Sequence, residues 1–134
     1  MEDKTLIGSI DFSTDPIFNE VHIGDITKIK NVGVYVYTTN EGTDIAHMHL
    51  IGLKDEICIK IFVAEFFTHG SKQGTLNRGQ SRIFDKFMRD QCRLKEYQGL
   101  TNWEAARKVW ILSKGSDYRG PGYDTIQPDY TKLV

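Results

Sequence analysis

The residues best suited to chemistry in this chain are two histidines separated by one residue, His47 and His49. Side chains at positions i and i+2 of an extended strand point to the same face, so the two imidazoles would lie side by side. Imidazoles bind zinc and other borderline metals, and a cysteine on the neighbouring strand would add a thiolate. The pattern therefore indicates a possible divalent metal site with His47, His49 and Cys58 as ligands.

Three stretches of sequence predict the strands that must position these side chains. Valines alternate with other residues over 32–37, a loop rich in turn formers leads into 45–51, and isoleucines alternate over 56–63. Two hairpins would join them into an antiparallel meander. One or two shorter strands are expected before it, over 6–12 and around 21–23.

The polar side chains of this meander would lie together on one face of the sheet. If the valines and isoleucines face the core, the middle strand directs its histidines to the opposite side, because side chains alternate. Hairpins centred on Gly42 and between Leu53 and Lys54 then fix the register. That register places Tyr35 opposite His49, Tyr37 opposite His47, Cys58 opposite His49 and Lys60 opposite His47. The polar face comprises Tyr35, Tyr37, His47, His49, Glu56, Cys58 and Lys60.

Two helices are expected after the sheet. Apolar residues recur at helical spacing over 77–97, which predicts an amphipathic helix there. Thr101 and Glu104 form a capping-box pattern, which predicts a second helix over 102–113 with its two tryptophans facing inward. Gly115 would end this helix. The following residues, 116–134, show no periodicity and suit an extended arm.

Together these elements predict an α+β fold: an antiparallel sheet of three to five strands with two helices packed on one face and an extended C-terminal arm. The length of 134 residues fits one domain, which we place at 1–115, with a tail at 116–134.

Composition narrows the classes of protein further. Hydrophobic residues make up 40% and charged residues 26% of the chain, which is typical of globular proteins. The net charge of −1 means that any charge-driven binding must come from a local patch. Two widely separated cysteines, no export signal and no apolar run of bilayer length favour a cytoplasmic protein.

The first predicted helix offers a local basic patch. Five basic residues follow one another at spacings of 4, 4, 3 and 4, so they would form a stripe along the helix. Such a stripe suits phosphates or an acidic protein. Because Asp85, Asp90 and Glu96 lie in the same segment, a solvated helix face is the simpler alternative. The stripe comprises Arg78, Arg82, Lys86, Arg89 and Arg93.

The order of these features resembles a family of small, uncharacterised bacterial domains. In that family a strand with paired aromatics leads through a polar turn into a His-any-His strand, and another strand and two helices follow. The matching stretches here are 34–38, 46–50, 76–88 and 103–110. Two prolines usually precede the histidine pair in that family, whereas Ile45 and Ala46 stand here.

The third predicted strand, the turn at 66–70 and the tyrosine-bearing tail are also similar to accessory proteins of gut Bacteroidales and their phages. Members of the histidine-strand family often look like parts of toxin–antitoxin or mobile-element gene pairs. The resemblance therefore implies an accessory binding role, and it implies no catalytic mechanism.

The sequence as a whole favours a small accessory binding protein of a phage or mobile element, acting in the cytoplasm of the bacterial host on a host or cognate protein. One alternative is a metal-assisted hydrolase or nuclease using His47 and His49, and another is nucleic-acid binding through the basic helix. A purely structural role for the histidines, covered by another part of the chain, also stays open. The predicted binding residues are Tyr35, Tyr37, His47, His49, Lys60, Arg78, Arg82, Lys86, Arg89 and Arg93.

Overall fold

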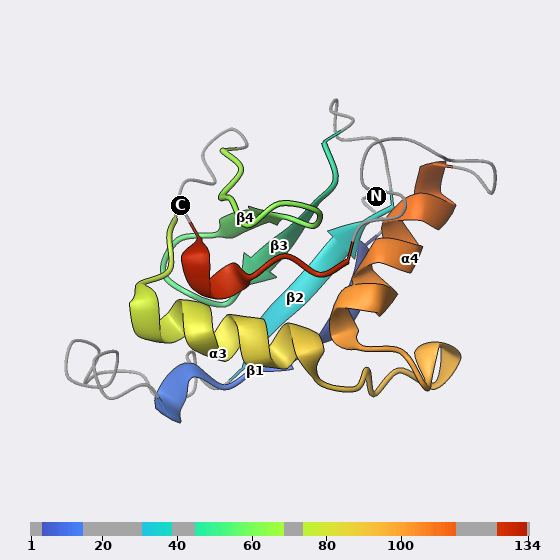
Figure 1. Cartoon of the computed structure of the whole chain (residues 1–134), viewed down its shortest axis with the longest axis horizontal. Coiled ribbons are helices and arrows are strands. Elements are labelled where there is room, and N and C mark those ends of the chain that lie inside the picture. Colours follow the sequence, from blue (N-terminus) through green and yellow to red (C-terminus); the bar gives the residue numbers. More distant parts are fainter. Residues whose placement is uncertain (1–3, 15–30, 39–44, 69–73, 115–125, 134) are drawn as a thin grey trace.

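The computed structural model describes residues 4–14, 31–38, 45–68, 74–114 and 126–133. They form a four-stranded antiparallel sheet in the order β1-β2-β3-β4, with two helices across one side of it (Figure 1). The strands are β1 Lys4–Ile10, β2 Val32–Tyr37, β3 His47–Ile51 and β4 Ile57–Lys60. The helices are α3 Arg78–Arg89 and α4 Asn102–Lys114, with single 3₁₀ turns η1 Phe12–Thr14, η2 Lys95–Tyr97 and η3 Tyr130–Lys132. The predicted α+β fold is confirmed.

The strand register agrees with the alternation of side chains along the meander. His49 pairs with Tyr35 on β2 and with Cys58 on β4, and His47 pairs with Lys60. Strand β1 adds a fourth member by pairing antiparallel with β2, with a register shift between Leu6 and Gly8. The possible strand around 21–23 and the turn at Gly42 lie outside the described residues.

Strand β4 ends three residues earlier than predicted, because the chain folds back on itself. The backbone N–H of Lys60 donates to the carbonyl of Glu65 at 2.9 Å, and Ile59 forms a bridge with Phe66. The returning segment brings Phe67 next to β4, where its N–H donates to the carbonyl of Cys58. This return places an aromatic ring beside β4, the strand that carries Cys58, one of the predicted metal ligands.

The apolar face of the sheet carries the core. The valines of β2, Met48 and Leu50 of β3 and the isoleucines of β4 are fully or almost fully buried, together with Phe84 from α3. The tryptophans of α4 are also buried, as predicted. A side chain at Gly8 would approach the ring of Phe87 to 2.7 Å, so this glycine permits α3 to lie close to β1.

Helix α3 is shorter than predicted, since it ends at Arg89 instead of near Tyr97. A capping box between Asn77 and Gln80 starts it. At the other end, the side chain of Asn102 donates to the carbonyl of Phe87 at 2.7 Å, and the N–H of Asp90 donates to the same oxygen. These two bonds use both lone pairs of the Phe87 carbonyl, so it cannot accept a further bond that would continue the helix. The chain turns away at this point, and the backbone N–H of Asn102 donates to the carbonyl of Asp90.

The described part of the C-terminal segment, 126–133, packs on the domain. In Figure 1 it crosses in front of the sheet and ends in η3 beside α3. Tyr130 is fully buried, its ring meets Phe84 edge-on at 5.0 Å, and its hydroxyl lies 2.7 Å from the carbonyl oxygen of Ile61. Burial raises the pKa of Tyr130, so the hydroxyl remains a hydrogen-bond donor. This part of the predicted arm therefore belongs to the core.

We expect Tyr130→Phe to lower the free energy of unfolding by about 1 kcal/mol, the usual value of one buried hydrogen bond. The cost stays small because Trp103 also donates to the carbonyl of Ile61. The measurement is urea unfolding followed by circular dichroism. Tyr97→Phe is the matched control, since Tyr97 is half-buried and its hydroxyl donates to no described residue. Equal stability of Tyr130→Phe and wild type would contradict this role.

Candidate functional site

The structure brings the predicted polar face together and also covers it. His47 and His49 are 0% exposed, and Cys58 is 1% exposed. The ring of His47 lies 4.7 Å from that of Phe67 and 5.8 Å from that of Trp110, measured between centroids. In this conformation neither histidine can contact a partner surface or a substrate.

The tyrosines and Lys60 have partners within the chain. The ring of Tyr37, predicted to lie opposite His47, packs against His49 at 4.4 Å. Tyr35 is half-buried and lies under the ammonium group of Lys4, 4.8 Å from the ring centre. Lys60 forms an ion pair with Glu65 at 2.7 Å. The polar face is therefore a set of internal contacts with partial exposure at its edge.

The two histidines differ in their polar partners. Nδ1 of His47 lies 2.7 Å from the carbonyl oxygen of Ile45, so that nitrogen carries the proton and donates. Nδ1 of His49 lies 2.6 Å from Oε2 of Glu56 and 3.4 Å from Sγ of Cys58. The structure thus unites two of the three predicted metal ligands, His49 and Cys58, and adds Glu56 in place of His47.

The geometry of this cluster does not match a nucleophilic triad. A cysteine–histidine–carboxylate triad places the thiol and the carboxylate on opposite nitrogens of the imidazole. Here Glu56 and Cys58 both approach Nδ1 of His49. The thiol is also buried, so the arrangement gives no support for a cysteine nucleophile.

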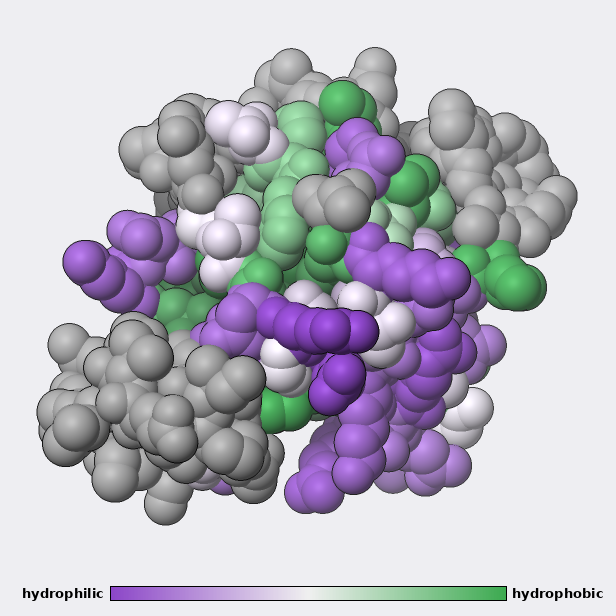
Figure 2. Space-filling model, turned by 60° about the vertical axis from the view of Figure 1, so that its left-hand side comes forward, coloured by the Kyte–Doolittle hydropathy of each residue, from purple (hydrophilic) through white to green (hydrophobic). Residues whose placement is uncertain are grey.

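The basic residues of α3 face solvent. Its four cations, Arg78, Arg82, Lys86 and Arg89, are exposed and lie within an arc of about 80° at 100° per residue. Figure 2, in which the N-terminal end of α3 comes forward, shows hydrophilic side chains gathered across the middle and lower part of this face. Arg93 is exposed but lies beyond the end of the helix, so the predicted five-residue stripe is interrupted.

Acidic residues neutralise this helix less than the sequence suggested. Asp85 is buried, and its carboxylate accepts hydrogen bonds from Nε of Arg89 at 2.9 Å and from the N–H of Tyr130 at 2.9 Å. The hydrogen bond to Asp85 raises the pKa of Arg89. Asp90 and Glu96 both follow the end of the helix. Asp85 thus neutralises Arg89, whereas Arg78, Arg82 and Lys86 form no ion pair with a described residue, so the exposed face of α3 carries a net positive charge.

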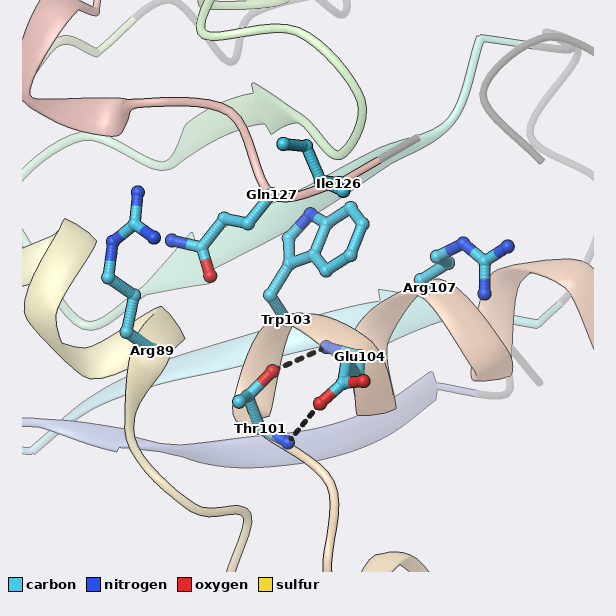
Figure 3. Close-up of a pocket in the computed structure, with 7 residues that line it drawn as sticks. All are labelled: Arg89, Thr101, Trp103, Glu104, Arg107, Ile126 and Gln127. Carbon is cyan, nitrogen blue, oxygen red and sulfur yellow. Dashed lines mark hydrogen bonds between the residues drawn. The ribbon is translucent and has the colours of Figure 1, made fainter. Parts of the chain in front are cut away.

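A pocket of about 610 Å³ continues this surface between α3, α4 and the C-terminal segment. Figure 3 shows the indole of Trp103 between Arg89 and Gln127 on one side and Arg107 on the other. Thr101 and Glu104 complete the wall by forming the predicted capping box, with bonds of 2.9 and 3.1 Å. Ile126 lies beside the indole and is 83% exposed.

Sequence reasoning missed this pocket. Its lining comes from three separate segments, and no pattern in the sequence predicts that Gln127 and Ile126 lie beside Trp103. Arg107 was visible as a cation in the predicted second helix, but nothing set it apart from other charged helical residues.

Comparison with known proteins adds no identification. The chain matches no protein-family model, no curated protein and no solved structure. Among the described residues, no helix combines the length and apolar character that crossing a membrane would require.

Burial of Cys58 can be checked directly by thiol chemistry. In a Cys92→Ser variant, we expect Cys58 to react with Ellman's reagent at least about 100-fold more slowly in native buffer than in guanidinium, because reaction requires opening of the structure. The Cys58→Ser variant reports on the buried Cys92 in the same way. Reaction of Cys58 at the denatured rate in native buffer would contradict the covered sheet face.

Proposed function

We propose that this protein is a small accessory binding protein that engages an acidic segment of a partner protein through a cationic surface. We define the cationic surface as the four exposed cations of α3 together with the pocket that Arg89 shares with Arg107. The observation that carries the proposal is the continuity of these cations with a pocket that adds Arg107 and an exposed isoleucine, Ile126. The family resemblance supports the accessory role and a phage or mobile-element setting.

The chemistry of the cationic surface suits carboxylates. Guanidinium groups bind carboxylates through two parallel hydrogen bonds, and arginine is enriched at the energetic centres of interfaces. From Arg78 to Arg89 the helix rises by about 16 Å, the length of roughly five residues of extended peptide. Exposed Ile126 provides an apolar contact at the rim. These features together fit an acidic peptide segment with one apolar anchor.

A protein partner fits better than nucleic acid. The chain has a net charge of −1 and an isoelectric point near 6.4, whereas nucleic-acid-binding domains are commonly strongly basic. Trp103 is only 5% exposed, so its ring offers no face on which a base can stack. The buried histidines play no part in this contact.

Charge reversal on α3 tests the proposal. We expect Arg82→Glu combined with Lys86→Glu to weaken capture of the partner protein at least about tenfold, because two attractive contacts become repulsive. The measurement is affinity purification with the tagged full-length chain from nuclease-treated lysate of the cells that produce it. It is followed by affinity measurement on the identified protein at two salt concentrations, with weaker binding expected at the higher salt.

The matched control reverses two exposed lysines that belong neither to α3 nor to the pocket lining, Lys54 and Lys95. Lys54→Glu combined with Lys95→Glu changes the net charge by the same amount, and we expect it to retain the partner. Equal retention by the α3 variant would contradict the proposal. Loss of all captured material after nuclease treatment would instead favour nucleic-acid binding.

A further inference from the structure

Three kinds of metal-binding atom meet on the β3–β4 hairpin. They are Nδ1 of His49, a carboxylate oxygen of Glu56 and Sγ of Cys58, all within 4.8 Å of one another. The sheet register holds them there, because Cys58 pairs directly with His49 and Glu56 is two residues before Cys58 on the same side of the hairpin. No element outside this hairpin is needed to bring the three groups together.

The separations are close to those of a tetrahedral zinc site. Zinc bonds of about 2.0–2.3 Å to nitrogen, oxygen and sulfur place neighbouring ligand atoms about 3.4–3.6 Å apart. Sγ of Cys58 and Nδ1 of His49 are already 3.4 Å apart. Nδ1 of His49 and Oε2 of Glu56 are joined by a hydrogen bond of 2.6 Å. A cation replacing that proton would require an opening of about 0.8 Å, which the partly exposed Glu56 side chain can provide.

Charge and donor type both select the cation. A thiolate with an imidazole favours zinc and cobalt over magnesium and calcium, which prefer oxygen ligands. A thiolate and a carboxylate balance the two charges of the cation, so the occupied site is neutral, as its burial requires. Binding displaces the thiol proton of Cys58 and requires the neutral imidazole of His49 to carry its proton on Nε2, which leaves Nδ1 free for the cation.

We propose that His49, Glu56 and Cys58 bind one borderline divalent cation of the zinc class. Three protein ligands leave a fourth coordination position for water or another ligand. His47 is a neighbour and not a ligand, because it does not belong to the group of ligand atoms that lie within 4.8 Å of one another, and its ring centre is 5.0 Å from that of His49. This site is independent of the cationic surface.

Cobalt(II) is the probe of choice, because a thiolate bound to it gives a charge-transfer absorption band. We expect the full chain, produced without a histidine tag and dialysed against a chelator, to bind one Co²⁺ with this band. Addition of Zn²⁺ should abolish the band as zinc takes the site. A folded wild-type chain that shows no band at about a tenfold molar excess of Co²⁺ would overturn the proposal.

Two matched variants make the assignment specific. Cys58→Ser should lose the band, whereas Cys92→Ser, which changes the other buried thiol, should keep it. Glu56→Gln should weaken Co²⁺ binding at least about tenfold; it alters a partly exposed side chain and so tests the site even if Cys58→Ser fails to fold. A band that survives Cys58→Ser, or unchanged affinity in Glu56→Gln, would overturn the ligand assignment.

Discussion

The carbonyl oxygen of Ile61, just after β4, anchors helix α4 and the C-terminal segment to the sheet. It accepts one hydrogen bond from Nε1 of Trp103 and one from the hydroxyl of Tyr130, each at 2.7 Å. A carbonyl oxygen has two lone pairs, so both are used here, and a single atom fastens α4 and the C-terminal segment to the end of β4. Asp85 adds a second fixed point, because its carboxylate binds both Arg89 and the backbone of Tyr130.

The carbonyl of Ile61 and the carboxylate of Asp85 together determine which side chains are exposed to solvent on this side of the molecule. They position Arg89 and Trp103 in the pocket and bring Gln127 and Ile126 across from α4, so the cationic surface continues from a helix into a concave site (Figure 3). The histidines and Cys58 remain enclosed, so they cannot contact a macromolecule in this conformation. The fold thus separates an exposed cationic surface from the internal cluster of His49, Glu56 and Cys58.

The features that depend on local periodicity, above all the strand register, could be predicted from the sequence. Alternation in β2 and β4 predicted the pairing of His49 with Tyr35 and Cys58, because one turn on each side sets a register of period two. Features set by distant residues could not be predicted. The end of α3 depends on Asn102, fifteen residues beyond the Phe87 carbonyl that it binds, and the burial of His47 depends on Phe67 and Trp110. Tyr130 lies in an aperiodic segment, so nothing local marked it as a core residue.

The most direct test of this account is amide hydrogen exchange at Tyr130, followed by NMR on the unmodified chain. The N–H of Tyr130 donates to the buried carboxylate of Asp85 at 2.9 Å, and this bond fixes the segment that forms one wall of the pocket. We predict that the amide of Tyr130 exchanges nearly as slowly as those of the central strands, β2 and β3, and much faster in Asp85→Ala. Exchange at the rate of an unfolded peptide in the wild-type chain would contradict it, because the pocket would then lack its C-terminal wall.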